Sequence, residues 1–133
     1  MKTIKIENIG KIARVTLSRP EVHNAFDAVM IGELTRAFTA FASDAAVRAV
    51  ILTGEGKSFC AGADLNWLGA SRKAAPAKLM EDTLKLSAMF RAIYDLDKPV
   101  IAAVNGSALG GGVGFLAVAD VVIAAQDAAF GLS

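Results

Sequence analysis

The segment from Lys98 to Phe115, KPVIAAVNGSALGGGVGF, restricts the fold more than any other part of the chain. Pro99 has no N–H and biases the residue before it away from the helical region, so a preceding helix must stop here. Val100 to Val104 is an apolar run of strand length, and Asn105-Gly106 marks a turn. Gly110-Gly111-Gly112 then opens a second apolar run, which predicts a helix whose first N–H groups are free to face an anion.

The uncharged run from Val100 to Ala119 also has the length of a membrane-spanning helix. Its five glycines argue against that interpretation, because glycine costs about 1 kcal/mol relative to alanine at each helical position. Pro99 before the run and the strand-like Val121-Val122-Ile123 after it argue in the same direction. We therefore expect a buried strand, turn and helix, and no membrane partner.

Length and charge exclude several classes of partner. The 133 residues carry 14 basic and 13 acidic side chains, a net charge of +1, which implies neither nucleic acid nor an anionic membrane as partner. A chain of this length is one domain, able to bury roughly two-thirds of its unfolded surface. Cys60 is the single cysteine and cannot form an internal disulfide, which suits a reducing compartment. Because MKTIKIENIG lacks the long apolar core of a secretory signal, we expect a cytoplasmic protein.

Short segments with strand patterns recur along the chain. Thr3 to Glu7, with Ile4 and Ile6 on one face, and Ile12 to Leu17 flank Asn8-Ile9-Gly10 and predict a hairpin. Three further segments are a predicted strand at Ala49–Leu52, a glycine-rich loop at Thr53–Asp64 and a predicted strand at Val121–Ala124.

Two other segments have the apolar spacing of amphipathic helices. The first begins after Asp27, a good N-cap, and ends at Ser43-Asp44, and the second runs from about Pro76 to Leu96. The predicted apolar positions are Met30, Ile31, Leu34, Phe38 and Phe41 in the first helix, and Leu79, Met80, Leu84, Met89, Phe90 and Ile93 in the second. Strands that alternate with helices indicate an α/β architecture with parallel pairing.

Four segments together resemble one known family. FCAGAD at Phe59–Asp64 and NGSALGGGVGF at Asn105–Phe115 are similar to the paired backbone motifs of the crotonase superfamily, the enoyl-CoA hydratases and isomerases. RPEVHNAF at Arg19–Phe26 and the final FGLS match the family's pattern in order and spacing. The resemblance implies the ClpP/crotonase fold, an α/β fold of superhelical ββα repeats. It identifies residues 1–133 as the N-terminal portion of a single acyl-CoA-binding domain, truncated at its C-terminal side, and implies a homotrimer or a hexamer built as a dimer of trimers.

The resemblance also implies a chemistry and the residues that carry it. Hydrating an α,β-unsaturated thioester, or moving its double bond, places negative charge on the thioester oxygen, and one preorganised N–H donor aimed there is worth roughly 3–4 kcal/mol. By resemblance the donors are the backbone N–H groups of Ala63 and Gly111. The acyl-CoA is implied to lie near residues 21–25 and along Ala63, Asp64, Leu65, Asn66, Gly111 and Gly114. Coenzyme A enters as part of the substrate, and neither a permanently bound cofactor nor a metal is implied.

Three of the candidate residues have structural alternatives. Asp64 suits a cap of the turn Leu65-Asn66-Trp67 as well as a ligand contact. His23, the only histidine, invites an acid–base role, but it lies in a proline-bounded loop where a solvated histidine is ordinary. Cys60 has no basic neighbour in the sequence that would activate its thiol, so we expect a small buried packing residue.

Position 114 departs from the family pattern. Hydratases of the family place a glutamate three residues after the oxyanion glycine, where this chain has Gly114, and a second carboxylate that would fall just after Ser133. Asp120 and Asp127 are the nearest acids, and their spacing fits strand ends. We expect hydration of an α,β-unsaturated acyl-CoA. The alternatives are an isomerase, another branch of the superfamily, or a non-catalytic fragment that self-associates.

The acyl chain and the direction of the reaction stay open at this point. The segments NAFD and FCAGADLNW are most similar to those of bacterial 3-methylglutaconyl-CoA hydratases. A dinucleotide-binding module is a different class, but its G-x-G-x-x-G motif is not completed, because Phe115 stands where a third small residue would have to follow Gly110 and Gly112.

Overall fold

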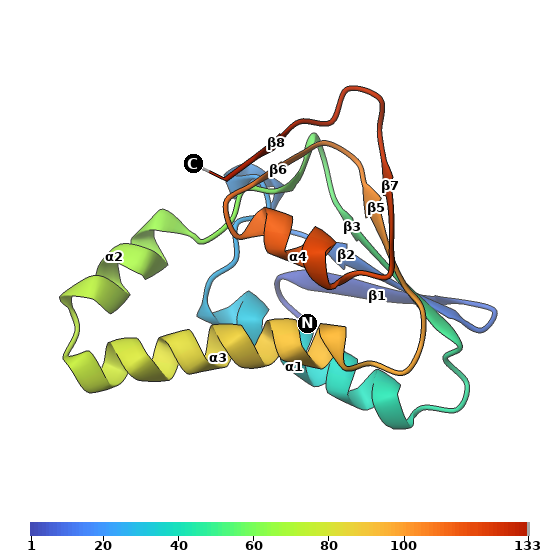
Figure 1. Cartoon of the computed structure of the whole chain (residues 1–133), viewed down its shortest axis with the longest axis horizontal. Helices are drawn as coiled ribbons and strands as arrows, with labels where there is room; N and C mark the ends of the chain where they lie inside the picture. The colour runs from blue at the N-terminus through green and yellow to red at the C-terminus, as the bar shows by residue number, and fades with distance from the viewer. Residues whose placement is uncertain (133) are drawn as a thin grey trace.

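The computed structural model describes residues 1–132, which form two β-sheets with helices packed around them (Figure 1). The larger sheet has the strand order β1-β2-β3-β5-β7, and the smaller has the order β4-β6-β8. The strands are β1 (Ile4–Ile9), β2 (Ile12–Leu17), β3 (Ala49–Gly54), β4 (Ser58–Cys60), β5 (Val100–Val104), β6 (Ser107–Leu109), β7 (Val121–Ala124) and β8 (Phe130–Gly131). The helices are the 3₁₀ turn η1 (Pro20–Val22), α1 (Ala28–Ser43), α2 (Leu65–Lys73), α3 (Pro76–Tyr94) and α4 (Gly112–Val118).

From β3 onward, two strands that follow each other in sequence lie in different sheets. The larger sheet contains β3, β5 and β7, and the smaller contains β4, β6 and β8. All hydrogen-bonded neighbours among these six strands run parallel. Helices α2 and α3 follow the first pair, and α4 follows the second. β1 and β2 form the predicted antiparallel hairpin, with Ile4 opposite Leu17. The predicted α/β architecture of ββα repeats and the predicted strand at Val100–Val104 are confirmed.

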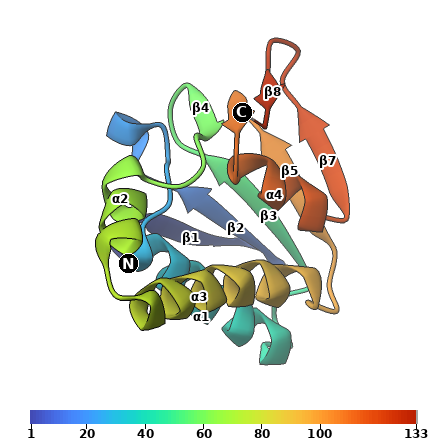
Figure 2. The same cartoon turned by 60° about the vertical axis from the view of Figure 1, so that its left-hand side comes forward.

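Helices α1 and α3 lie side by side along the larger sheet, as Figures 1 and 2 show from two directions. α1 begins at its predicted N-cap, where a carboxylate oxygen of Asp27 accepts a hydrogen bond from the Met30 N–H at 3.0 Å. The predicted apolar face of α1 is buried against the sheet. The residues of this layer include Met30, Ile31, Leu34, Phe38 and Phe41 from α1 and Val15, Leu17, Val50 and Leu52 from β2 and β3. Burying one such side chain is worth about 1.5–3 kcal/mol, so this layer dominates the stability of the fold.

Local patterns mispredicted two segments whose structure depends on distant parts of the chain. The predicted loop Thr53–Asp64 contains β4, a strand of 3 residues that exists because Ser58 pairs with Ser107 of β6. The predicted turn at Leu65 is the first turn of α2. Neither segment has enough residues in a repeating pattern for periodicity to reveal it.

Burial also differs from the prediction at helix α3. Met89 and Ile93 are buried, but Leu79, Met80 and Leu84 are 39%, 60% and 61% exposed. The first half of α3 extends past the larger sheet next to α2 (Figure 1), so no sheet covers these side chains. On the edge strand β1, Ile4 is 2% exposed, whereas Ile6, expected on the same face, is 37% exposed.

The uncharged run at residues 100–119 folds as β5, β6 and α4, which confirms the predicted strand, turn and helix and adds the short β6. Within residues 1–132, none of the helices has the length and apolarity that crossing a bilayer requires.

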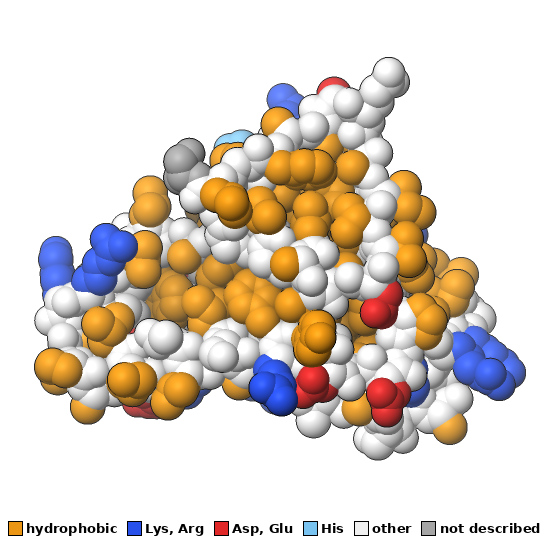
Figure 3. All heavy atoms as spheres, in the orientation of Figure 1, with side chains coloured by type: hydrophobic (Ala, Val, Ile, Leu, Met, Phe, Trp, Pro, Cys, Tyr) orange, Lys and Arg blue, Asp and Glu red, His pale blue; other side chains and the backbone are white. Residues whose placement is uncertain are grey.

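β7 and β8 are the outermost strands of their sheets, so each presents an unpaired edge among residues 1–132. Figure 3 shows hydrophobic side chains gathered on the face that carries β6, β8 and α4. The exposed hydrophobic residues of these strands and of β7 are Leu109 (41%), Val121 (48%), Val122 (42%), Ile123 (63%) and Phe130 (53%). β7 contains no lysine, glutamate or proline of the kind that keeps edge strands from pairing with other chains.

We expect the 133-residue chain to self-associate at micromolar concentration, because an uncharged apolar edge strand pairs readily with another strand. Replacing Ile123 with lysine puts a charge on this edge and should shift the mass measured by light scattering toward that of the monomer. Thr39→Lys on the exposed side of α1 is the control and should leave the mass distribution unchanged. A monomeric mass for the unsubstituted chain would contradict the expectation.

Candidate active site

Two glycine-containing loops touch at the end of β4 and the start of α4. Gly62 has a φ of +93°, which favours glycine over residues that carry a side chain. A Cβ placed on Gly62 would lie 2.8 Å from the carbonyl oxygen of Leu109 and 3.1 Å from the backbone nitrogen of Gly111. Only a residue without a side chain fits at position 62. The absence of a Cβ there allows the backbone of this loop to contact the first turn of α4.

Two backbone N–H groups lie at this contact without an acceptor. Among residues 1–132, neither the Ala63 N–H nor the Gly111 N–H donates a hydrogen bond. Ala63 is held on both sides, because Phe26 N donates to Gly62 O at 2.9 Å and Asp64 N donates to Phe26 O at 2.8 Å. Both residues are half-buried and small, so a ligand oxygen has room to approach. Unpaired N–H groups that are partly shielded from water are uncommon, and two of them can together polarise a carbonyl group.

Asp64 caps helix α2. Its Oδ1 accepts hydrogen bonds from the N–H groups of Asn66 at 2.9 Å and Trp67 at 3.0 Å, and its Oδ2 accepts one from Arg19 Nη2 at 3.2 Å. The hydrogen bond from Trp67, together with the Arg19 guanidinium, holds the pKa of the Asp64 carboxyl below its usual range. Of the two roles left open by the sequence, the cap is confirmed, and a ligand contact stays a prediction.

Arg19 connects the caps of α1 and α2. Its Nη1 donates to the carbonyl oxygen of Ala25 at 2.6 Å and lies 3.6 Å from Oδ2 of Asp27, the N-cap of α1. Its Nη2 reaches Asp64, the N-cap of α2. The planar fork of arginine suits several oxygens at once, and the Arg19 side chain is only 17% exposed, so salt screens these contacts weakly. Arg19 therefore fixes the start of α2 relative to α1.

Asn24 ties the same segment to the entry of β4. It is fully buried, with a φ of 58° that asparagine adopts more readily than most residues. Its Oδ1 accepts from the Arg19 N–H at 2.8 Å, and its Nδ2 donates to the carbonyl oxygens of Glu55 and Ser58, both at 2.9 Å. Neither Arg19 nor Asn24 was predicted from the sequence to be a site residue. The available signal was their place in the RPEVHNAF segment.

The other titratable candidates have contacts of their own. His23 is exposed, and its Nδ1 lies 2.9 Å from Oγ of Ser58. Oδ2 of Asp120 accepts a hydrogen bond from the Val100 N–H at 2.8 Å, which is the strand-end role expected for it, and Asp127 lies exposed in a turn. Within residues 1–132, no three His, Cys, Asp or Glu side chains cluster closely enough to hold a metal ion.

A groove of about 310 Å³ brings several predicted substrate-binding residues together. It is lined by Val22, Ala25, Ala61, Ala63, Asp64, Leu65 and Asn66. Four of the six predicted residues, together with part of the predicted segment 21–25, therefore share one surface. Gly111 meets this surface through its contact with Gly62, whereas neither Gly111 nor Gly114 lines the groove itself.

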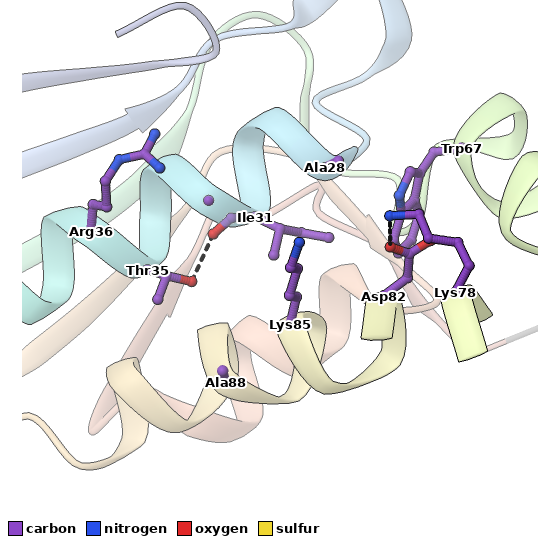
Figure 4. Close-up of a pocket in the computed structure, with 10 residues that line it drawn as sticks. Ala28, Ile31, Thr35, Arg36, Trp67, Lys78, Asp82, Lys85 and Ala88 are labelled. Atoms are coloured by element: carbon purple, nitrogen blue, oxygen red, sulfur yellow. Dashed lines mark hydrogen bonds and ion pairs between the residues drawn. The ribbon is translucent and has the colours of Figure 1, made fainter. Parts of the chain in front are cut away.

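A second groove, of about 400 Å³, separates α1 from the first half of α3 (Figure 4). Its lysines are engaged in ion pairs along α3, Lys78 with Asp82 at 2.9 Å and Lys85 with Glu81 at 2.9 Å. Asp82 is buried and also accepts a hydrogen bond from the Ser71 hydroxyl at 2.6 Å. The hydrogen bond from Ser71 joins α2 to α3, and the ion pairs neutralise both lysines of the groove, so we place the candidate active site at the contact of Gly62 with Gly111.

Comparison with known proteins points to one family. The family model described as enoyl-CoA hydratase/isomerase matches residues 7–133. A probable enoyl-CoA hydratase of Rhodobacter capsulatus is 44% identical over 128 residues, which cover 96% of this chain and 48% of the relative. A hexahydro-1H-indene-carboxyl-CoA hydrolase of Mycobacterium tuberculosis is 40% identical over 121 residues, covering 91% of this chain and 48% of the relative.

A solved structure gives the same assignment of the fold. The crystal structure of a putative enoyl-CoA hydratase/isomerase (crotonase) from Legionella pneumophila superposes with a TM-score of 0.91 at 35% identity, covering 96% of this chain and 49% of that chain. The predicted crotonase fold is confirmed. The chain spans about half the length of the curated relatives it matches.

We expect Asp64→Ala to lower the free energy of unfolding at neutral pH by about 0.5–2 kcal/mol, the usual cost of losing an N-cap. The folded-state pKa of Asp64 lies below its unfolded value, so the ionised carboxylate stabilises the fold above about pH 4. That contribution is lost as the pH falls through the lower folded-state pKa, so the difference between the two proteins should shrink in acid. Urea unfolding at pH 7 and in acid measures it. Asp97→Ala, at an exposed position, is the control, and an equal loss from both substitutions would contradict the assignment.

We expect Cys60 to resist alkylation in the folded chain. It is fully buried, and burial raises the pKa of its thiol to about 11, so hardly any thiolate is present at pH 8. Mass spectrometry after treatment with iodoacetamide should detect no adduct on the native chain and one adduct on the chain unfolded in guanidinium. Alkylation of the native chain as fast as of the unfolded one would contradict the predicted packing role.

Proposed function

Because this chain belongs to the enoyl-CoA hydratase/isomerase family, we propose that the protein hydrates an α,β-unsaturated acyl-CoA thioester. The observation that carries the proposal is the pair of backbone N–H groups of Ala63 and Gly111, which have no acceptor within residues 1–132 and lie where two loops meet. The resemblance of the sequence motifs assigns these same two groups as the donors of an oxyanion hole.

In the proposed reaction the thioester oxygen accepts hydrogen bonds from Ala63 N–H and Gly111 N–H. A water oxygen forms a bond to the β-carbon and gives up a proton to a base, while the electron pair of the double bond moves toward the thioester oxygen. The two N–H groups stabilise this enolate, and each is worth roughly 3–4 kcal/mol because it is already oriented. Protonation of the α-carbon then completes the addition of water.

The coenzyme A portion is proposed to lie in the groove lined by Ala63, Asp64, Leu65 and Asn66 and by the segment at residues 21–25. The groove supports this placement because the Ala63 donor lines it together with Leu65, which is exposed to solvent. We propose that coenzyme A binds only as part of the substrate.

The acid–base groups of the reaction are proposed to lie outside residues 1–132. Gly114 supplies no side chain, and Asp120 is engaged with the backbone of Val100. An isomerase or another reaction of the superfamily is the second candidate, because the family model describes both hydratases and isomerases and the M. tuberculosis relative is named as a hydrolase of a carboxyl-CoA compound. Assaying hydration, isomerisation and hydrolysis of acyl-CoA thioesters side by side distinguishes these activities.

We also propose that residues 1–133 are the N-terminal portion of one acyl-CoA-binding domain, and that the complete protein is a cytoplasmic trimer or dimer of trimers. The exposed strand edges of β7 and β8 support the first proposal, because another segment or chain has to cover them. The lone buried Cys60 is in keeping with a reducing compartment.

We expect Gly111→Pro to weaken binding of an enolate-mimicking CoA analogue by roughly 100- to 1,000-fold, the usual effect of removing one oxyanion donor. Proline lacks the N–H, and the φ of −61° at Gly111 is one that proline adopts. Gly111→Ala is the matched control, because it keeps the N–H while adding the same Cβ against Phe26. Isothermal calorimetry measures both affinities, and circular dichroism checks the fold. Equal affinities for the two folded variants would refute the assignment of Gly111.

A further inference from the structure

Phe90 of α3 sits against the helix that follows Gly111. A Cβ placed on Gly114 would lie 2.8 Å from Cζ and 3.0 Å from Cε1 of Phe90, closer than non-bonded carbons pack. The Gly114 N–H donates to the Gly111 carbonyl at 3.0 Å, so position 114 lies one turn along α4 from the proposed donor. The Phe90 ring therefore occupies the space where a Cβ at position 114 would lie.

The ring of Phe90 is held in place by other aromatic rings. Its centroid lies 5.2 Å from that of Phe115 and 6.3 Å from that of Phe26, the latter in a perpendicular arrangement at 88°. Phe26 in turn supports Gly111, because a Cβ on Gly111 would lie 2.7 Å from Phe26 Cζ. The first turn of α4 thus rests on two aromatic rings, one against Gly111 and one against Gly114.

Phe90 differs from its neighbours in being open on one side. Phe26 and Phe115 are 1% and 0% exposed, whereas Phe90 is half-buried. Trp67 and Ala63, which are also half-buried, pack against the same hydrophobic core, and the Trp67 ring centroid lies 6.4 Å from that of Phe26. Figure 3 shows hydrophobic side chains on this face of the molecule between α2, α3 and α4. The proposed oxyanion donors therefore have an apolar, partly aromatic wall beside them.

We propose that Phe90 is a specificity-determining residue that contacts the acyl group of the bound thioester and fills the space beside Gly114. The inference rests on the proposed function, since the acyl group lies next to the wall only if the thioester oxygen binds at Ala63 and Gly111. An acyl chain is apolar, so it gains by leaving water for this surface.

The first experiment compares coenzyme A, butyryl-CoA and decanoyl-CoA by calorimetry on the unsubstituted protein and on Phe90→Leu. Coenzyme A alone should bind both proteins equally, because it lacks the acyl group. The ratio of the decanoyl-CoA to the butyryl-CoA affinity should change by about tenfold in Phe90→Leu, the scale expected when roughly two methylene groups change their burial. Phe41→Leu is the matched control: Phe41 is 6% exposed and packs on Phe38 at 5.5 Å, so this change should leave the ratio unaltered.

The second experiment tests the packing of position 114 against position 90. Gly114→Ala should lower the midpoint of thermal unfolding, and adding Phe90→Ala should restore part of that loss, because the smaller side chain makes room for the new methyl group. Gly69→Ala is the control, since nothing lies within 4 Å of a Cβ at that helical position and its midpoint should not fall. Additive losses from Gly114→Ala and Phe90→Ala would overturn the proposed contact.

The binding outcomes separate this inference from the proposed function. If no protein binds coenzyme A or its thioesters, the proposed function fails and the role of Phe90 fails with it. If coenzyme A and both thioesters bind and the affinity ratio is the same in the unsubstituted protein and in Phe90→Leu, the role of Phe90 is overturned while the proposed function stands. A changed ratio in Phe90→Leu, with no change in Phe41→Leu, supports the proposal.

Discussion

The close approach of backbone to backbone in the candidate site, between Gly62 and Gly111, is the constraint on which the rest of the site depends. A Cβ at Gly62 would approach both the Leu109 carbonyl and the Gly111 nitrogen too closely for a stable contact. Each loop is also bound to a strand of the smaller sheet, so the contact is set by the pairing of β4 with β6. Two N–H groups from segments far apart in sequence are thereby held without acceptors in one region of residues 1–132. Such an arrangement is costly for stability and useful for binding an oxygen that gains negative charge.

Aromatic packing and polar capping hold that arrangement from two sides. Phe26, Phe90 and Phe115 form edge-to-face and tilted pairs under the first turn of α4, each worth about 0.5–1.5 kcal/mol beyond simple burial. On the other side, Arg19 binds the caps of α1 and α2 together. The Arg19 contacts are shielded from solvent, whereas Lys85–Glu81 on α3 is more than half exposed on both partners and contributes little. The Arg19 contacts therefore add shielded polar interactions to the loop that carries Ala63.

The predictions that held were those that depend on local chemistry. Asp27 was expected to cap α1 and does so, and the period of Met30, Leu34 and Phe38 identified the buried face of that helix. The buried strand Val100–Val104 and the start of α4 at the glycines followed from Pro99 and from the glycine run. In each case a few consecutive residues contain the whole cause, since helix caps, helix periods and proline stops act over one or two turns.

The amino-acid sequence by itself determined the α/β class, the hairpin and the long helices, and its resemblance to the family named Ala63 and Gly111 as candidate donors. Only the tertiary structure decided which surfaces those elements share. It placed Gly62 against Gly111, showed that Phe90 fills the space beside Gly114, and left Leu84 in solvent where its spacing predicted burial. The physical reason is the distance in sequence over which each interaction acts. Hydrogen bonds within a turn depend on neighbouring residues, whereas the burial of a side chain and the close approach of two backbones depend on which distant segment packs against them.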